Sequence, residues 1–284
     1  MSKSLHSCSC YFIELNIVQI HPDVKELDLT RTRSKKIEGL DHLKKINSLC
    51  FRWNLLSKIE NLSNLVTLTE LDLYDNQITK IENLEALVNL ETLDLSFNRI
   101  ANRGLSKLVS LETLELGANQ IAKIENLYSN INLKFLYLGA NQIEQMENLG
   151  ELTHLQVLSL PCNAIQEIQA IENLTELKQL ILCQNGIKQI CGLESNTKLE
   201  ILDLNTNMLE RISGISHLQS LTDFWAKENQ LRKWSDVAVL RSLPNLSLVY
   251  LGMNPFSKDH DYMRRAMRDL PQVERIDSGM RSSY

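Results

Sequence analysis

Apolar residues recur along this chain with a period of 22 positions. In residues 71–98 a Leu-x-Leu segment is followed by an asparagine and then by isoleucines and leucines spaced mostly three apart, and the order restarts at Leu93 and Leu95. The asparagine that follows each segment of this type forms a series: Asn54, Asn76, Asn98, Asn119, Asn141, Asn163, Asn185, Asn207, Asn229 and Asn254. The step is 22 residues except for 21 after Asn98 and 25 after Asn229. The pattern indicates a repeat protein with one short and one long unit.

Each position of the repeat predicts a structural role. Strand side chains alternate between two faces, so Leu71 and Leu73 are expected to point into a core while Asp72 points outward. The asparagine amide offers two donors and an acceptor to the backbone of the turn that follows the strand. The remaining apolar positions, three apart, predict turns or 3-10 segments on the outer side. We therefore predict an α/β solenoid: a leucine-rich-repeat horseshoe with a concave parallel β-sheet, 22-residue repeats, convex turns and 3-10 segments.

The same pattern divides the chain into three parts. Residues 1–20 are expected to be an N-terminal flank, 21–254 an array of about eleven repeats whose degenerate first unit has Thr32 in the asparagine position, and 255–284 a C-terminal helical cap. The cap helix is predicted from one apolar face, with Ser257 or Asp259 at its start and Pro271 at its end; that face carries Tyr262, Met263, Ala266, Met267 and Leu270. The one-residue deletion after Asn98 predicts a local change in curvature.

Composition and charge narrow the partner classes. A net charge of −5 and a pI near 5.8 supply no electrostatic attraction toward nucleic acid or anionic lipid. No run approaches the apolar length of a membrane span, and the first residues lack a signal-peptide core. Six scattered cysteines, of which only Cys8 and Cys10 are close in sequence, are interpreted as reduced thiols. We expect an intracellular protein, monomeric by itself, without nucleic-acid or membrane partners; the role of Cys8 and Cys10 stays open.

The chain offers little catalytic chemistry. It has no glycine-rich phosphate loop, and its six histidines lack ligand spacing. Asp72 and Asp94 on neighbouring strands could form an acid/base pair, but the repeat supplies no pocket or distinct nucleophile around them. A redox or metal role for Cys162 and Cys183 is a weaker alternative to free thiols. We therefore predict a protein that is not an enzyme, with no cofactor and no metal.

Candidate binding residues lie at the outward strand positions. Thirteen acidic side chains and six basic ones fall there, so the concave face is predicted to be acidic. The same positions hold the aromatic residues Trp53, Tyr74, Phe97, Phe135, Tyr137, Trp225 and Tyr250. Exposed rings beside carboxylates are typical of a protein-binding surface. For Tyr74 or Phe97 the ring could equally cover a neighbouring strand, whereas Trp225 and Tyr250 beside Asp223 favour binding.

Three features together resemble one known family. They are the repeat form Ile-x-x-Ile-Glu-Asn-Leu-x-x-Leu, the stretch LTDFWAKENQLRKWSD, and the ending VYLGMNPFSKDHDYMRRAMRDLPQVERID. With LDLYDNQITKIENLEAL, they are similar to the leucine-rich-repeat family of protein phosphatase 1 regulatory subunit 7. The resemblance covers residues 21 to 278. The repeat is shared by many proteins, whereas the DFW…WSD stretch joined to this ending is much more specific.

The resemblance implies a non-catalytic regulatory subunit. Its concave face would bind the catalytic subunit of protein phosphatase 1, a metal-dependent Ser/Thr phosphatase of nucleus and cytoplasm, and would modulate its activity, maturation or location. Residues that match the family's contact pattern are Asp94, Glu115, Tyr137, Asp203, Asp223, Trp225 and Tyr250. The chain departs from the family in lacking an aromatic-bearing repeat between the units of Asp94 and Glu115. The alternatives are a leucine-rich-repeat scaffold or adaptor of a ribonucleoprotein or axonemal complex, and a hydrolase using concave carboxylates.

Overall fold

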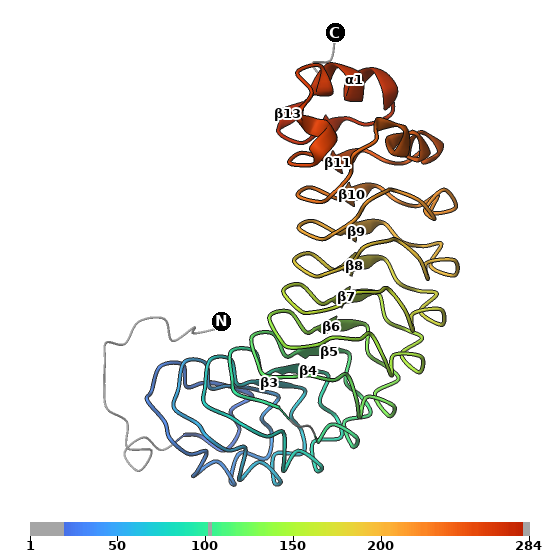
Figure 1. Ribbon diagram of the computed structural model, residues 1–284. Helices are drawn as coiled ribbons and strands as arrows, with labels where there is room; N and C mark the ends of the chain where they lie inside the picture. The colour runs from blue at the N-terminus through green and yellow to red at the C-terminus, as the bar shows by residue number, and fades with distance from the viewer. Residues whose placement is uncertain (1–19, 102–103, 281–284) are drawn as a thin grey trace, which may run out of the picture.

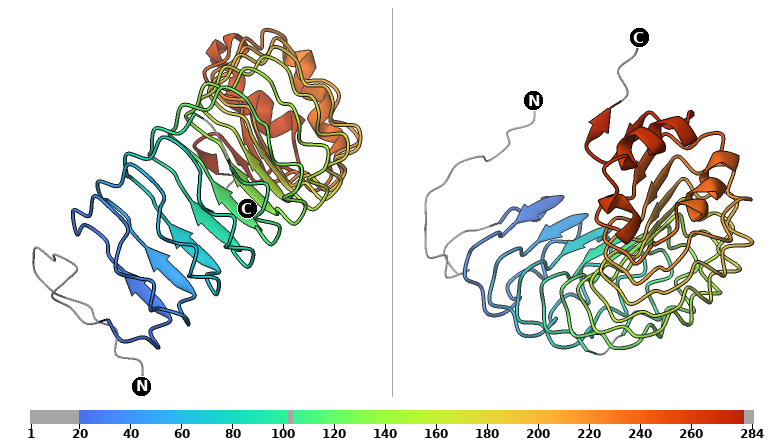
Figure 2. Two further views of the ribbon diagram at one scale, coloured as in Figure 1. Left: turned by 90° about the horizontal axis from the view of Figure 1, so that it is seen from below. Right: turned by 45° about the horizontal axis from the view of Figure 1, so that its top comes forward.

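The chain forms an arch of stacked repeats whose strands run side by side along the inner wall (Figures 1 and 2). The computed structural model describes residues 20–101 and 104–280, so most of the predicted N-terminal flank lies outside the described residues. One sheet contains every strand in sequence order: β1 Glu26–Asp28, β2 Ser48–Cys50, β3 Glu70–Asp72, β4 Thr92–Asp94, β5 Thr113–Glu115, β6 Phe135–Tyr137, β7 Val157–Ser159, β8 Gln179–Ile181, β9 Ile201–Asp203, β10 Asp223–Trp225, β11 Leu248–Tyr250, β12 Arg275–Ile276 and β13 Gly279–Met280. β1 to β12 pair in parallel and β13 returns antiparallel. The predicted fold class is confirmed.

Each strand points its middle residue into the core, and so does the apolar residue that follows the strand. Leu71 in β3 and Phe224 in β10 are fully buried, as is Leu73 just after β3. Successive repeats pair residue for residue, with Leu71 opposite Leu93 and Phe224 opposite Val249. Each repeat therefore buries its apolar side chains against the units before and after it, and no repeat has a core of its own.

The series of asparagines from Asn54 to Asn254, here called the ladder asparagines, pairs the buried backbone at each strand end. Asn119 Nδ2 donates to the carbonyl oxygens of Leu95 at 3.0 Å and Leu116 at 3.1 Å, and its Oδ1 accepts from Ile100 N at 2.9 Å. One amide thus joins two adjacent repeats. In the first repeat Thr32 takes this position, as predicted, and its hydroxyl donates to Leu29 O at 3.0 Å.

The convex side consists of turns with i to i+3 backbone hydrogen bonds, such as Leu87 N to Leu84 O at 2.9 Å. A second asparagine position recurs there with a positive φ, and Asn83 Nδ2 donates to Ile59 O at 2.7 Å. Gly192 occupies the same position at φ 70°, where an added Cβ would lie 2.8 Å from Ile168 O. Within the described residues the continuous 3-10 helices are η1 (Trp234–Ser242) and η2 (Pro255–Lys258), both at the C-terminal end.

The short repeat after Asn98 keeps the sheet continuous. Asp94 pairs with Glu115 in the same register as its neighbours, although the step is 21 residues. Gly104 explains how the shorter turn fits, because a Cβ at this position would lie 2.6 Å from the carbonyl oxygen of Ile81. Only a residue without a side chain allows this approach.

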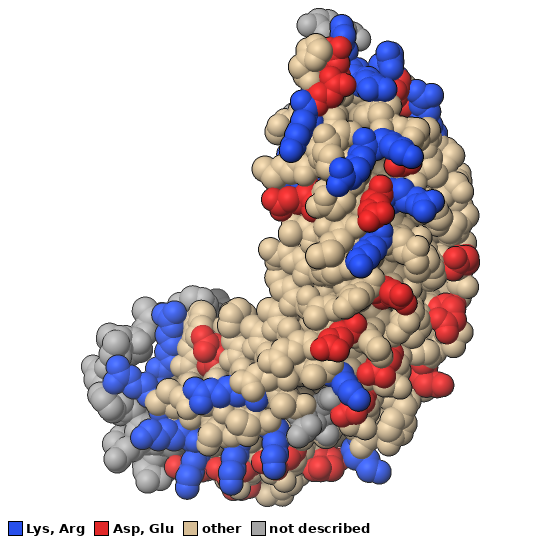
Figure 3. All heavy atoms as spheres, viewed as in Figure 1, with Lys and Arg blue, Asp and Glu red and all other residues tan. Residues whose placement is uncertain are grey.

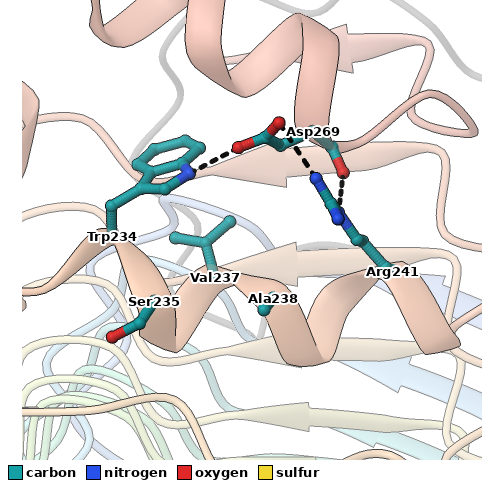
Figure 4. Close-up of a pocket in the computed structure, with 6 residues that line it drawn as sticks. All are labelled: Trp234, Ser235, Val237, Ala238, Arg241 and Asp269. Atoms are coloured by element: carbon teal, nitrogen blue, oxygen red, sulfur yellow. Dashed lines mark hydrogen bonds and ion pairs between the residues drawn. The ribbon is translucent and has the colours of Figure 1, made fainter.

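A compact cap closes the C-terminal end. Helix α1 (Tyr262–Asp269) buries Tyr262 and Ala266 as predicted. Figure 4 shows η1 joined to the end of α1: Trp234 Nε1 donates to Asp269 Oδ2 at 2.8 Å, and Arg241 Nε donates to Asp269 O at 2.6 Å. These residues border a cavity of about 160 Å³.

The predicted start of the cap helix needs one correction. Ser257 does not begin α1; its hydroxyl donates to Asn254 O at 2.9 Å and so belongs to the turn that opens η2. Asp259 contacts the helix start through its carbonyl oxygen, which accepts from Tyr262 N at 3.0 Å, and Asp261 is the N-cap. Several polar residues precede the helix in the sequence. Because the 3-10 helix η2 occupies Pro255–Lys258, α1 begins only after Asp261.

The ladder asparagines make a direct stability test possible. We expect Asn119→Ala to lower the free energy of unfolding by about 3 kcal/mol, because buried backbone groups of two repeats lose their partner. Asn132→Ala is the matched control, since Asn132 makes one exposed hydrogen bond to Val109 O; its loss is expected to stay below about 1 kcal/mol. Urea unfolding followed by circular dichroism measures both. Equal losses in the two variants would contradict the proposed role of the ladder.

Candidate functional site

The outward strand residues form a continuous surface on the concave face. In β10 Phe224 is buried, whereas Asp223 and Trp225 on either side of it point outward and are half-buried. The register places Asp203, Trp225 and Tyr250 next to one another across β9, β10 and β11. Neither ring lies beneath the sheet. The structure therefore brings together four of the seven predicted site residues.

Trp225 and Tyr250 form the aromatic part of this group. Their ring centroids lie 5.8 Å apart at an interplanar angle of 45°, within the range of favourable aromatic pairs. The indole Nε1 of Trp225 is buried and has no hydrogen-bond partner among the described residues. Asp223 is oriented by Thr222, whose hydroxyl donates to Asp223 Oδ2 at 2.6 Å. The rings are thus held in place beside an oriented carboxylate.

Carboxylates gather at a second part of the face, on β3 to β5. Asp72, Asp94 and Glu115 are register neighbours. Arg52, which follows β2, reaches Asp72 Oδ2 at 2.5 Å and Asp94 Oδ2 at 3.0 Å. Burial raises the pKa of Asp72, with a further contribution from the charge of Asp94. Burial likewise raises the pKa of Glu115, and the charge of Asp94 adds to it. Three acids share one arginine here, so negative charge is in excess.

Two of the predicted contact acids also have a structural role. Asp94 is 6% exposed and Asp203 is 5% exposed. Asp94 Oδ1 accepts from Ser96 N, and Asp203 Oδ1 accepts from Asn205 N, both at 2.9 Å. These hydrogen bonds end the strand in a tight turn. The two aspartates contribute charge to the face mainly from beneath its surface.

Tyr137 of β6 extends the acidic group on β3 to β5. It lies opposite Glu115 in the register of β5 and β6, and its pKa is raised by burial and by the charge of Glu115. Strands β7 and β8 separate this group from the one on β9 to β11. At about 4.8 Å per strand, β6 and β9 lie on the order of 14 Å apart along the sheet. A single ligand that contacts both groups must therefore extend over on the order of 14 Å.

A third group of outward residues is an aromatic row near the N-terminal end. Trp53 and Tyr74 meet edge to face at 6.2 Å, and Tyr74 and Phe97 lie 4.9 Å apart. Trp53 is 42% exposed and Phe97 is 52% exposed. Both interpretations made from the sequence apply: the rings pack on their neighbours and still leave apolar surface in water.

The geometry gives little support to a redox or metal role for the cysteines or to a metal site elsewhere. Burial, with Asp203 adding to it, raises the pKa of Cys183 to about 12, so its thiol is a poor nucleophile at neutral pH. Within the described ranges, three potential metal-ligand side chains come together at Asp259, His260 and Asp261, on the surface of the cap. Exposed acidic groups of this kind are common without an ion. No helix in the described part of the chain is long and apolar enough to span a membrane.

The comparisons with known proteins agree on the fold. A family model described as "Leucine Rich repeats (2 copies)" matches residues 66–108, 88–129 and 109–151. A leucine-rich-repeat protein of Leptospira interrogans is 28% identical with a TM-score of 0.78, over 84% of this chain and 62% of that one, so the chain spans less than two thirds of it. Internalin C2 of Listeria monocytogenes is 30% identical with a TM-score of 0.57, over 74% of this chain and 82% of that one. No curated protein is similar enough in sequence to count as a match.

The chain belongs to the leucine-rich-repeat family. Its fold is also shared by FLRT2, solved in an octameric complex with latrophilin 3 and Unc5D, at 20% identity and a TM-score of 0.75 over 94% of this chain and 87% of that one. Leucine-rich-repeat proteins act as scaffolds for protein interactions, and the comparisons indicate no enzyme family.

The crowded carboxylates predict that ionisation of Glu115 lowers the free energy of unfolding. The folded chain holds the proton of Glu115 more tightly than the unfolded chain does. This group therefore favours folding below its ordinary pKa and opposes it as pH rises through the raised pKa. We expect Glu115→Gln to increase the free energy of unfolding by about 0.5 kcal/mol at about pH 7, allowing for solvent screening, and the gain to vanish below about pH 4.

The control for this prediction is Glu112→Gln. Glu112 lies next to β5 but pairs with Lys134 at 2.7 Å, so its substitution is expected to give no gain at neutral pH. Chemical unfolding of the three proteins across the pH range measures the effect. A Glu115→Gln variant that is less stable than the unsubstituted protein at neutral pH would refute the electrostatic account.

Proposed function

We propose that this protein is a non-catalytic regulatory subunit that binds the catalytic subunit of protein phosphatase 1 through its concave face. In this role it modulates the activity, maturation or location of the phosphatase, as an intracellular protein of nucleus and cytoplasm that is monomeric without its partner. The observation that carries the proposal is the pair of half-buried rings, Trp225 and Tyr250, side by side on an outward surface beside Asp223.

The aromatic pair supports a protein partner on energetic grounds. Large rings that are partly exposed and held rigid bury much apolar area on binding and lose little conformational entropy. Asp223 adds a fixed negative charge at the edge of the same group.

The acidic group on β3 to β5 supports a partner with a basic patch. Asp72, Asp94 and Glu115 share one arginine, and a partner's lysine or arginine would relieve their mutual repulsion. The resemblance to the regulatory subunit 7 family supplies the identity of the partner, and all seven residues matched to its contact pattern occupy outward strand positions. The separation of the two groups along the sheet fits a folded protein as the ligand.

The aromatic pair gives the decisive binding test. We expect Trp225→Ala and Tyr250→Ala each to weaken binding of the purified phosphatase catalytic subunit by about thirtyfold, equivalent to about 2 kcal/mol. The loss follows from truncating a ring that the partner buries. Isothermal titration calorimetry or biolayer interferometry with the catalytic subunit measures the dissociation constants.

Tyr128→Ala is the matched control, because Tyr128 is an aromatic residue that is 63% exposed and lies outside the strands. It is expected to bind like the unsubstituted chain. Undiminished binding by the Trp225→Ala/Tyr250→Ala double variant would remove these residues from the mechanism. If native complexes purified with the chain contain other proteins and no phosphatase, the adaptor alternative replaces the proposal.

A further inference from the structure

A cavity of about 620 Å³ opens at the C-terminal end of the concave face. It lies between the segments that follow β9 to β11 and the cap elements α1 and β12, and its volume falls within the roughly 300–1,000 Å³ of typical ligand sites. Tyr250 borders the cavity and also forms the ring pair with Trp225. The cavity therefore continues the proposed protein-binding surface and does not form a separate site behind it.

The charge of this cavity is opposite to that of the face beside it. Lys227, which follows β10, and Arg275 of β12 both border it, and neither has an ion pair within the described part of the chain. Figure 3 shows Lys and Arg side chains at both ends of the arch, with Asp and Glu side chains among them at the C-terminal end. Two cations without an ion-pair partner among the described residues provide a site for a negatively charged group.

The one carboxylate of the cavity is already engaged. Asp277 Oδ1 accepts from the backbone N–H groups of Leu251 and Gly252, each at 2.9 Å. Its Oδ2 accepts from the buried Tyr262 hydroxyl at 2.7 Å. Asp277 also packs closely on Gly252, where an added Cβ would lie 3.3 Å from the carboxylate and would fit only if a neighbour moved by a few tenths of an ångström. Asp277 holds the cap in place and does not neutralise the two cations through a direct contact.

Apolar side chains form the rest of the cavity wall. Met253 is 65% exposed, and Met263 of α1 packs partly against the core. Tyr250 supplies an aromatic edge. Methionine adapts its shape to a ligand and makes favourable contacts with aromatic groups. The cavity thus combines an adaptable apolar wall with two cations that form no ion pair with another described residue.

We propose that this cavity binds a segment of a partner protein in which an aromatic or aliphatic side chain stands next to a carboxylate. The apolar side chain contacts Met253, Met263 and Tyr250, and the carboxylate pairs with Lys227 and Arg275. For the identity of that partner the inference rests on the proposed function. The basic patch of the partner then lies on the acidic strands and its acidic segment at the cap, so the two ends of the face fix its orientation.

A peptide experiment tests the cavity without the phosphatase. The probe is a capped tetrapeptide of glutamate, leucine, phenylalanine and aspartate, and its control replaces both acids by lysine. We expect the acidic peptide, added up to about 10 mM to detect weak binding, to shift the methyl resonances of Met253 and Met263 in methionine-labelled protein. The chain has seven methionines, and Met253→Leu and Met263→Leu assign the two signals. No shift, or equal shifts with both peptides, overturns the proposal.

Charge reversal adds a second readout. In Lys227→Glu/Arg275→Glu the response to the acidic peptide is expected to disappear. Lys123→Glu/Lys188→Glu makes the same change of charge at exposed positions that do not border the cavity, and its response is expected to match that of the unsubstituted chain. Thermal unfolding of both variants checks that the fold is retained. A full response in the first variant, or a loss of response in both, refutes the role of the two cations.

The phosphatase catalytic subunit then tests the orientation. The cavity variant is expected to bind it about tenfold more weakly, and the control variant to bind within about twofold of the unsubstituted chain. If the unsubstituted chain fails to bind, the proposed function fails while the peptide result still decides the cavity. If it binds and the cavity variant binds equally well, the proposed function stands and the cavity has no part in that complex.

Discussion

The structure depends on pairing the backbone groups that each short strand leaves buried at its end. A strand of three residues followed by a sharp turn exposes its own N–H and C=O groups to the core, where each unpaired group would cost about 1–3 kcal/mol. The ladder asparagines solve this once per repeat, and Asn119 shows how, since its amide bonds to Ile100 N, Leu95 O and Leu116 O at the same time. Every interface between repeats contains the same connection. The stack is therefore stabilised locally, from one neighbour to the next.

Because stability resides mainly in the inward leucines and the ladder asparagines, the fold constrains most outward strand positions less; Asp94 and Asp203, which bond to the turn after the strand, are exceptions. The variation of the outward positions is not random along the arch. Aromatic residues stand at β10 and β11, and carboxylates are crowded on β3 to β5, where burial raises the pKa of Asp72 and Glu115. A surface that keeps ionised acids in an unfavourable position gives up some stability. A ligand of opposite charge would recover that free energy on binding, which explains the arrangement better than any requirement of the fold.

The repeat made most of this architecture predictable from the sequence. The spacing of leucines and asparagines located the strands, the inward and outward faces, and the outward position of Trp225, because each of these depends on a neighbour one repeat away. The pairing of Arg52 with Asp94 across two strands depends on side-chain reach and conformation, which a period does not encode. Ser257, one of the two residues predicted to begin the cap helix, belongs to η2 for a related reason: the cap lies outside the repeat, and its turns depend on contacts such as that of Phe256 with Trp234 of η1.

The cavity at the cap is a second feature that the repeat period does not predict, and it matters for function. Lys227 belongs to a repeat, whereas Met263 and Arg275 come from the cap, 36 and 48 residues further along the chain. No local pattern brings them together; Asp277 does so, by bonding to Leu251 and Gly252 on one side and to Tyr262 on the other. A solenoid end must be closed to protect its core, and here the closing element carries charge of its own. The cap therefore gives the two ends of a repetitive surface different chemistry, which a stack of identical repeats cannot do alone.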